Sequence, residues 1–395
     1  MKKKIIFMII NMNVGGTEKA LLNMISEMPE DKYDITILML EKYGGFLSQI
    51  PREVKVEYVK EFNEIKEVYY NPPHITALSL LRKRKFFRAF NIMSLHFISK
   101  AMNNRSYFFK YLLKECPVKI IEYDVAVAYA GPMDLISYYV LNKIKAKKKV
   151  QWIHFDVSKI RFNHLVESKL YNQFDKILVV SNEGRKKLIN LIPSLKEKTE
   201  VFLNIVSQKL IHSQVKEGTG FQDDFNGIRI LTVGRLTSEK GQDIAIRVLA
   251  KLIENGYNVK WYCIGEGNSR TKYEKLIKEY NLEAEFILLG TDPNPYPYIN
   301  QCDIYVQPSR HEGYCITLAE ARCLNKPIIT TDFTGANEQI KQKKTGLIVS
   351  VDEKEIYQAL TEMINNTELR NMFSTNLGKE LIDFTSKSRR ISKLI

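Results

Sequence analysis

Short apolar runs alternate along this chain with longer segments in which apolar residues recur every three or four positions. The first run covers residues 4–10, and two glycines separate it from a helical pattern. Similar runs cover residues 35–40, 125–130 and 177–180. Continuous apolar runs of this length are typical of strands buried on both faces, and the intervening pattern is typical of amphipathic helices. The alternation predicts an α/β fold with a parallel sheet covered by helices on both sides.

The same alternation begins again in the second half of the chain. The runs that predict strands there cover residues 228–233, 259–264, 286–289, 304–307 and 328–331. Helical patterns lie between them, and Asp243 stands where it could cap the first of these helices. The second half is therefore expected to form a second doubly wound α/β unit of similar size.

The predicted domain boundaries follow from where this alternation stops. Residues 208–225 are polar and lose periodicity, which is typical of a linker. We therefore predict an N-terminal domain at 1–205, a linker at 206–226, a C-terminal domain at 227–373 and a separate helix at 374–395. A ligand site is expected between the two domains, because the carboxyl ends of both sheets can open onto one cleft.

The composition is that of a globular protein. The chain has 395 residues, of which 45% are hydrophobic, so it can bury two or three cores. Its five cysteines show no CxxC spacing, which argues against a disulfide framework or structural zinc and indicates a cytoplasmic location. The basic start followed by apolar residues 5–10 imitates a signal peptide, but we interpret it as the first strand. No run approaches the roughly 20 apolar residues of a membrane span.

The net charge of +14 is consistent with binding to nucleic acid, to an anionic membrane surface or to phosphorylated substrates. Residues 75–114 contain nine basic residues and no acidic one, interleaved with phenylalanine and tyrosine. Such a segment can lie in a membrane interface, although an ordinary helix pair with aromatic core residues is the alternative. The residues assigned to a membrane or acceptor surface are Arg82, Lys83, Arg84, Lys85, Phe86, Phe87 and Arg88.

The strongest chemical signal is the segment SRHEGYCITLAE at residues 309–320. Glu312 lies in a glycine-containing loop after a predicted strand, and Glu320 lies eight residues later in the next helix. The loop can offer Glu312 and backbone N–H groups to one ligand, while Glu320 reaches another part of it. A pair of carboxylates suits hydroxyl-rich ligands such as a sugar and a ribose. The alternative for Glu320 is a solvated helix residue.

Three further motifs lie where predicted strands end. Arg235 and Lys240, in GRLTSEKG, bring two cations that can neutralise a pyrophosphate without a metal. Gly15 and Gly16 open a helix whose N–H groups can bind phosphate, although a tight turn without ligand is the alternative. The full G-x-G-x-x-G fingerprint is missing, which disfavours a dinucleotide dehydrogenase. His154 can carry a proton or donate a hydrogen bond to a substrate, but most lone histidines are structural.

Taken together and in this order, these motifs resemble the retaining glycosyltransferases of family 4. The resemblance covers nearly the whole chain, is closest over residues 309–332 and is strongest to bacterial capsule and exopolysaccharide enzymes. It implies a GT-B fold, in which two Rossmann-like doubly wound domains face each other across a cleft. It also implies that the helix at 374–395 packs back on the N-terminal domain.

The resemblance assigns a role to each matched residue. Arg235 and Lys240 would hold the donor diphosphate, Glu312 the hydroxyls of the transferred sugar and Glu320 the ribose. His154 would lie beside the reacting centre, which completes the implied catalytic set of His154, Arg235, Lys240 and Glu312. The implied donor-binding residues are Gly15, Gly16, Arg235, Lys240, Gly265, Leu289, Gly290, Thr291, Glu312, Gly313, Tyr314, Cys315, Ile316, Thr317 and Glu320.

The implied reaction moves a hexosyl group, with retention, from a nucleotide diphosphate sugar to a hydroxyl acceptor. A UDP-sugar is the expected donor, and a lipid-linked glycan at the inner membrane face is the expected acceptor, as in cell-surface polysaccharide synthesis. Because no Asp-x-Asp cluster occurs in a donor loop, we expect no metal and no cofactor. The alternatives are a nucleotide-sugar epimerase or phosphorylase of the same fold, and a nucleic-acid-binding protein indicated by charge alone.

Overall fold

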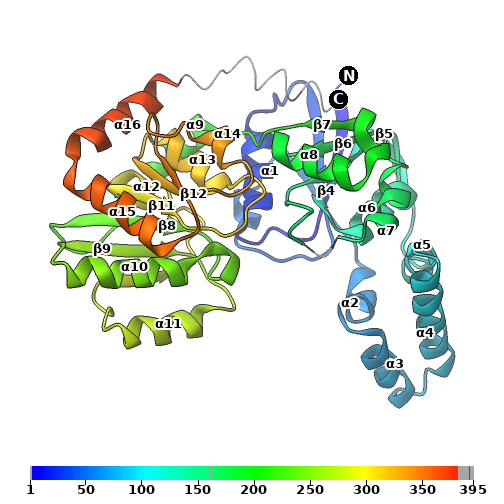
Figure 1. Cartoon of the computed structure of the whole chain (residues 1–395). Coiled ribbons are helices and arrows are strands. Elements are labelled where there is room, and N and C mark those ends of the chain that lie inside the picture. The colour runs from blue at the N-terminus through cyan, green and yellow to red at the C-terminus, as the bar shows by residue number, and fades with distance from the viewer. Residues whose placement is uncertain (1, 161, 381–390, 392–395) are drawn as a thin grey trace. The chain divides into compact units, whose positions relative to one another are not determined.

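A computed structural model of the chain describes residues 2–160, 162–380 and 391. The described residues form two compact units, coloured along the chain in Figure 1. Unit 1 falls within residues 1–13, 28–202 and 390–395, and unit 2 within residues 14–27 and 203–389. Each unit contains one parallel sheet with helices packed on it, so the predicted α/β class is confirmed.

Unit 1 is built on a seven-stranded parallel sheet with the order β3-β2-β1-β4-β5-β6-β7. Its strands are β1 (Lys3–Ile9), β2 (Tyr33–Met39), β3 (Lys55–Tyr58), β4 (Lys119–Gly131), β5 (Ile144–Ile153), β6 (Lys176–Val179) and β7 (Thr199–Val201). Its helices are α2 (Phe62–Tyr70), α3 (Pro73–Arg82), α4 (Phe86–Ala101), α5 (Ser106–Leu112), α6 (Asp134–Lys143), α7 (His164–Tyr171) and α8 (Asn182–Leu191). The central strand β1 is buried on both faces over residues 5–9, as its continuous apolar run predicts.

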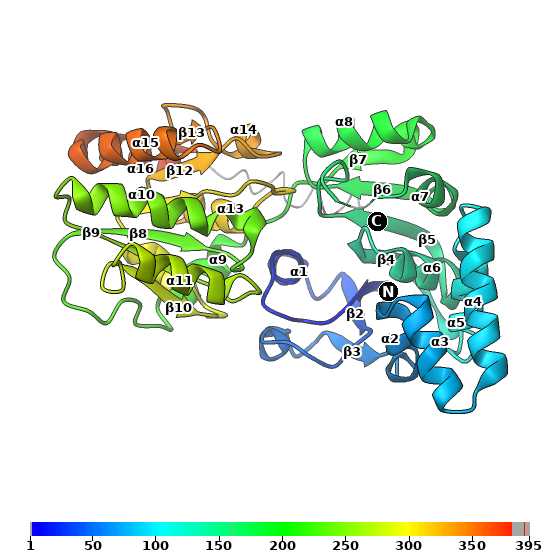
Figure 2. The same cartoon turned by 60° about the horizontal axis from the view of Figure 1, so that its bottom comes forward.

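Helices α2 to α5 form an insertion between β3 and β4. Figures 1 and 2 show α3 and α4 side by side as a pair that projects away from the sheet of unit 1. The insertion shares the core of unit 1, because Leu80, Ile92 and Phe109 are buried in the same hydrophobic cluster. Phe86 and Phe87 are instead exposed, so the aromatics of this segment divide between core and surface.

Unit 2 is built on a six-stranded parallel sheet with the order β10-β9-β8-β11-β12-β13. Its strands are β8 (Ile228–Val233), β9 (Val259–Ile264), β10 (Phe286–Gly290), β11 (Ile304–Gln307), β12 (Ile328–Thr331) and β13 (Leu347–Val349). Its helices are α1 (Gly16–Ser26), α9 (Gln208–Val215), α10 (Gln242–Glu254), α11 (Arg270–Glu279), α12 (Tyr296–Gln301), α13 (Ile316–Cys323), α14 (Ala336–Gln339), α15 (Glu353–Asn365) and α16 (Thr367–Lys379). Helices α10 and α11 lie on one side of the strands, and α12 and α13 lie on the other (Figure 1).

The predicted linker is partly wrong. Residues 208–215 form helix α9, which Ser207 caps by accepting a hydrogen bond from the backbone of Leu210 at 3.3 Å. The helix buries Ile211 and Gln214 and packs against α12 and α13. With few apolar positions in two turns, its sequence carries too weak a period to be distinguished from a linker.

The predicted domain limits also differ from the observed units. Residues 14–27, which include α1, group with unit 2 although they lie between strands of unit 1. The expected helix at 374–395 begins as the end of α16, which belongs to unit 2 and ends at Lys379. Residues 381–390 and 392–395 lie outside the described residues, so its packing on the N-terminal domain stays a prediction.

Candidate functional site

The predicted donor-binding residues of unit 2 follow four neighbouring strands at one edge of its sheet. Gly290 ends β10, Gly265 follows β9, and Arg235 lies two residues after β8. Glu312 lies in the loop after β11. Because these strands are adjacent and parallel, their carboxyl ends bring residues that are far apart in sequence to one edge.

Glycines allow the loops at this edge to approach one another closely. Gly265 has a φ of +147°, and a Cβ on it would lie 2.1 Å from the carbonyl oxygen of Gly234. Gly241 has a φ of +75°, and a Cβ there would lie 2.0 Å from the carbonyl oxygen of Pro308. Any side chain would collide with backbone at both positions, so the loops after β8, β9 and β11 depend on glycine. Gly241 also precedes α10, so the predicted cap at Asp243 is wrong.

Lys240 and Glu312 form a buried ion pair at the centre of this edge. The Lys240 Nζ lies 2.6 Å from the Glu312 Oε1, and the two side chains are 17% and 8% exposed. Burial by itself would lower the pKa of Lys240, but the Glu312 carboxylate raises it above its ordinary value. The ammonium therefore stays charged at neutral pH, and the loop after β8 is tied to the loop after β11.

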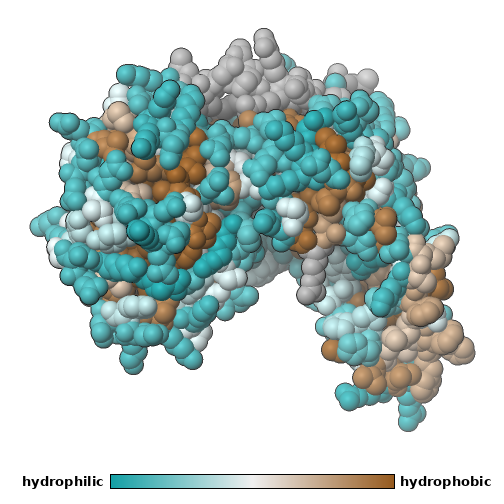
Figure 3. Space-filling model, viewed as in Figure 1, coloured by the Kyte–Doolittle hydropathy of each residue, from teal (hydrophilic) through white to brown (hydrophobic). Residues whose placement is uncertain are grey.

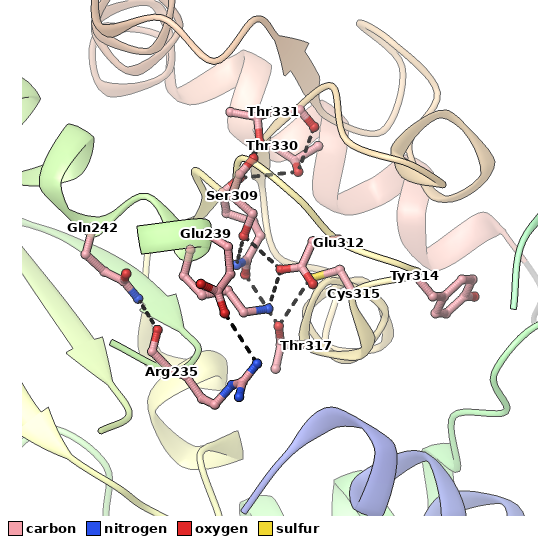
Figure 4. Close-up of polar contacts among 12 residues, drawn as sticks. Arg235, Glu239, Gln242, Ser309, Glu312, Tyr314, Cys315, Thr317, Thr330 and Thr331 are labelled. Carbon is pink, nitrogen blue, oxygen red and sulfur yellow. Dashed lines mark hydrogen bonds and ion pairs between the residues drawn. The ribbon is translucent and has the colours of Figure 1, made fainter. Parts of the chain in front are cut away.

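A chain of buried side chains holds the Glu312 carboxylate in place, and Figure 4 shows the link between Ser309 and Glu312. The Ser309 hydroxyl donates to the Glu312 Oε1 at 2.8 Å, and the Gln307 Nε2 donates to the Ser309 Oγ at 2.8 Å. The Tyr305 hydroxyl donates to the Gln307 Oε1 at 2.8 Å. Sequence analysis missed Gln307 and Ser309 as site residues. The sequence feature that could have revealed them is a pair of polar side chains at the end of an otherwise apolar buried strand.

Arg235 presents a largely free guanidinium beside this network. Its side chain is 56% exposed, and its Nη2 lies 3.4 Å from the Oε1 of Glu239. Sequence analysis also missed Arg310, whose two Nη atoms each donate to an oxygen of Asp243 at 2.8 Å. This bidentate pair holds the loops in place and leaves Arg235 available to an anion.

The N-termini of α1 and α13 meet at the same edge. A Cβ on Gly16, the first residue of α1, would lie 3.4 Å from the Ile316 Cγ2, at the first residue of α13. In the described part of the chain, no side chain caps either helix, since Gly15 and Cys315 occupy the two cap positions. Backbone N–H groups and aligned helix dipoles make such termini favourable for anions.

Two other predicted donor residues have distinctive local geometry. Cys315 has a φ of +60°, a left-handed conformation that costs energy for any residue with a Cβ. Burial raises the pKa of its thiol, which therefore stays neutral. The ring of Tyr314 points away from the polar network in Figure 4, so only the backbone of Tyr314 remains a candidate for donor contacts.

Glu320 is buried rather than solvated. It is 1% exposed, and its Oε1 accepts a hydrogen bond from the Tyr296 hydroxyl at 2.7 Å. Lys19 of α1 lies with its Nζ 4.7 Å from the centre of the Tyr296 ring. Burial raises the pKa of Glu320, although Lys19 and Tyr296 oppose the shift. The interpretation of Glu320 as a solvated helix residue is therefore wrong, and its role at a ribose stays a prediction.

Glu18, the last residue of the Gly-Gly-Thr-Glu motif, is an acid with a raised pKa at the start of α1. Burial raises the pKa of Glu18 to about 7, while its own backbone N–H and the Arg235 guanidinium lower it. Its charge therefore changes near neutral pH beside one of the two cations.

His154 follows β5 and belongs to unit 1. It is 7% exposed, and its ring lies 4.5 Å from that of Tyr129 and nearly parallel to that of Trp152. Burial lowers the pKa of His154 to about 3, so the imidazole is neutral at neutral pH. Of its two predicted roles, a hydrogen bond to a ligand fits this environment better than proton transfer, which needs a pKa near the working pH.

The described residues contain no group of three His, Cys, Asp or Glu side chains placed to hold a metal ion. Metal independence nevertheless stays a prediction. Nor does any described helix combine the length and the apolar character that crossing a membrane requires.

Solved structures share this architecture over almost the whole chain. A TarM mutant from S. aureus, in complex with Fondaparinux, alpha-GlcNAc-glycerol and UDP, superimposes with a TM-score of 0.71 at 16% identity and covers 99% of both chains. Anabaena HepE in complex with UDP-glucose has a TM-score of 0.69 at 17% identity and covers 99% of this chain and 98% of its own. The fold is GT-B.

A family model matches the second unit of this GT-B fold. Residues 221–379 match the model of the family described as Glycosyl transferases group 1. The Campylobacter jejuni N-acetylgalactosamine-N,N'-diacetylbacillosaminyl-diphospho-undecaprenol 4-alpha-N-acetylgalactosaminyltransferase is 33% identical over 221 residues, which are 54% of this chain and 59% of that protein. The Staphylococcus aureus capsular polysaccharide biosynthesis glycosyltransferase CapM is 29% identical over 38% of this chain and 40% of its own length. The chain thus matches less than two thirds of either relative.

Proposed function

We propose that the chain is a glycosyltransferase that moves a sugar from a nucleotide diphosphate sugar to a hydroxyl acceptor. The observation that carries this proposal is the gathering of Lys240, Arg235 and two uncapped helix N-termini around the Glu312 carboxylate. A nucleotide sugar combines a diphosphate with sugar and ribose hydroxyls, which need cations and carboxylates respectively. The family model of glycosyl transferases matches the part of the chain that carries most of these groups.

The cations would stabilise the leaving group. In the transfer, the bond between the anomeric carbon and the diphosphate oxygen breaks, and the diphosphate leaves with the electron pair. Lys240, Arg235 and the N-termini of α1 and α13 would neutralise the charge that develops on this oxygen. This is the work a divalent metal would otherwise do, so the proposal includes activity that persists in EDTA.

The acceptor oxygen then forms the new bond to the anomeric carbon. We propose that it attacks from the face that the diphosphate leaves, so that the configuration is retained. A leaving phosphate oxygen can accept the acceptor proton on that face. His154 would contribute a hydrogen bond as a neutral imidazole, because its pKa is too low for it to take up the proton.

Glu312 would hold the transferred sugar. In the described part of the chain, both hydrogen bonds of its carboxylate go to the Oε1, from Lys240 and Ser309. The Oε2 is thus left to accept from a sugar hydroxyl, in an orientation that its two partners fix. Glu320 and the residues from Leu289 to Thr291 are proposed to contact the nucleoside.

We further propose a UDP-sugar as donor and a lipid-linked glycan as acceptor. Support for UDP comes from TarM and HepE, whose crystals contain UDP or UDP-glucose. Support for a lipid-linked acceptor in cell-surface polysaccharide synthesis comes from the names of the C. jejuni relative and CapM. Action at the inner membrane face is part of the same proposal.

The test is a donor screen on the full chain, with UDP-, GDP- and ADP-sugars in turn. We expect one UDP-sugar to raise the melting temperature and, with a glycan acceptor extract, to yield free UDP and a glycosylated product in the presence of EDTA. Conversion of the donor into its epimer without release of UDP would instead identify an epimerase. If no nucleotide sugar raises the melting temperature, the proposal is wrong.

A further inference from the structure

One face of α4 is apolar and exposed to solvent. Phe86, Phe90, Met93 and Phe97 are 60%, 71%, 43% and 73% exposed. Their spacing of four, three and four residues places them on one side of a helix. We refer to these four residues as the α4 stripe.

The α4 stripe is not the core face of its helix. The opposite side of α4 packs into unit 1 through Ala89 and Ile92, which are 3% and 1% exposed. A surface helix normally places polar residues opposite its buried side. Helix α4 instead has apolar residues on its exposed side as well, which packing within this chain does not require. The neighbouring α3 adds exposed Ile75, Leu78 and Leu81. Figure 3 shows brown and tan colouring over much of the projecting α3–α4 pair.

Five cations lie at one end of this apolar surface. The turn between α3 and α4 contains Arg82, Lys83, Arg84 and Lys85, and Arg88 follows in the first turn of α4. None of the five forms an ion pair with a residue that the structure describes. Elsewhere in residues 75–114, Arg105 pairs with Asp134 and Lys114 pairs with Glu115.

An exposed apolar face with cations beside it favours one kind of partner, an anionic lipid surface. We propose that the α3–α4 surface docks on the anionic leaflet of a lipid bilayer, with the α4 stripe in the interface and the cations at the headgroups. A second copy of the same surface would bring the unpaired cations together, which disfavours a symmetric self-interface. In this proposal α4 lies along the surface, because its exposed apolar residues occupy only one side of the helix.

Docking would bring unit 1 to the place where a lipid-linked acceptor is found. That consequence rests on the function proposed above, but the docking itself does not. Lipid binding can be measured without a sugar donor, and donor binding can be measured without lipid. The failure of one proposal is therefore distinguishable from the failure of the other.

The experiment is flotation of the full chain with vesicles of phosphatidylcholine, alone or with phosphatidylglycerol. We expect binding to the mixed vesicles at low salt, little binding to phosphatidylcholine alone, and weaker binding at high salt. Neutralising Arg82, Lys83, Arg84 and Lys85 to Gln should lower the partition coefficient by roughly several hundredfold, because each of the four surface cations contributes about fivefold.

A second variant tests the apolar contribution. Phe86→Ser, Phe90→Ser and Phe97→Ser together should reduce binding at least about tenfold while the salt dependence remains. Matched controls lie on unit 2: Lys272, Lys275 and Lys278 to Gln on α11, and Val351→Ser with Met372→Ser. All five control positions are exposed, and both control variants should bind like the unchanged chain.

Several outcomes would overturn the proposal. One is a chain that ignores anionic vesicles at low salt, and another is equal loss of binding in the α4 and control variants. A third is a chain that is dimeric without lipid and becomes monomeric in the phenylalanine variant, which would assign the surface to a second copy. Melting temperatures, and their rise with UDP, should match the unchanged chain in every variant, so a folding defect cannot imitate lost docking.

Discussion

The two units share an architecture but differ in what they expose. Both are parallel sheets with helices on their faces, and both place candidate residues after the ends of strands. In unit 2 that edge carries a buried ion pair, an exposed guanidinium and two uncapped helix N-termini. In unit 1 the corresponding residue, His154, is neutral and packed among aromatic rings.

Unit 1, in turn, exposes many more large apolar side chains than unit 2. Among the described residues, the large apolar side chains that unit 2 exposes are Tyr280, Leu289, Val351 and Met372. All the others belong to unit 1, and eleven of them fall between Ile75 and Tyr107. The same fold thus carries the proposed donor site in one unit and an apolar, basic surface in the other. The difference arises from the loops and the insertion between strands, while the sheets are alike.

The largest expected effect comes from the ion pair of unit 2. Lys240→Ala removes one of the two cations proposed to hold the diphosphate, so transfer should fall about 10²- to 10³-fold. Steady-state kinetics with the UDP-sugar would measure this, with Lys272→Ala on α11 as the matched surface control. Turnover within twofold of the unchanged chain would contradict the assignment. The unfolding temperature must be measured too, since the change also strands a buried Glu312 carboxylate.

The second prediction concerns pH. Since the pKa of Glu18 is raised to about 7, the acid is neutral below pH 7 and a carboxylate above it. The KM for the UDP-sugar should therefore rise severalfold from pH 6 to pH 8, because the carboxylate competes for Arg235 and repels the diphosphate. Glu18→Gln should flatten this profile.

The raised pKa of Glu18 also predicts how the free energy of unfolding changes with pH. The contribution of Glu18 to stability is fully present below its unfolded pKa, and it is lost as the pH rises through about 7. The free energy of unfolding of Glu18→Gln should therefore change less than that of the unchanged chain between pH 5 and pH 8. Parallel pH profiles of KM for both proteins would contradict the assignment of Glu18.

A smaller effect is expected at the support of Glu312. Ser309→Ala removes one hydrogen bond to its carboxylate, worth about 1 kcal/mol, so kcat should fall about fivefold with little change in KM. Ser350→Ala is the control, because Ser350 makes a comparable bond of 3.0 Å to the exposed Glu355. If KM rises while kcat is unchanged, Ser309 contacts the donor and does not position Glu312.

The smallest effect concerns backbone strain at the start of α13. Cys315→Gly should raise stability by about 1 kcal/mol, because glycine accepts a φ of +60° without strain. For a unit of this size that corresponds to roughly 2–4 °C in melting temperature. Cys315→Ala keeps the strain and removes the thiol, so it should not be stabilising. A lower melting temperature for Cys315→Gly would show that thiol packing outweighs strain.

The sequence predicts the central strands well, because buried parallel strands are continuous apolar runs, but it did not reveal the short edge strands β3, β7 and β13. All five strands predicted for unit 2 were found within a residue or two of their expected limits. Helix α9 was not predicted, because eight residues with few apolar positions show no clear helical periodicity. The grouping of α1 with unit 2 was not predicted either, because it depends on packing between segments far apart in the chain.

Site residues could be predicted only where they stand in a short, contiguous sequence motif. Glu312 and Lys240 stand in glycine-containing motifs after strands, and the structure pairs them. Arg310 and Asp243 belong to two different loops, so nothing in either loop reveals their bidentate bond. The proximity of Tyr296 and Lys19 to Glu320 likewise arises only when three helices pack together.

The central claim is that the edge of unit 2 holds a nucleotide diphosphate sugar, and calorimetric titration of UDP tests it most directly. The account predicts saturable binding to the full chain in EDTA, at least tenfold weaker binding to Lys240→Ala, and unchanged binding to the triple phenylalanine variant of the α4 stripe. Equal UDP affinity of Lys240→Ala and the unchanged chain would contradict it.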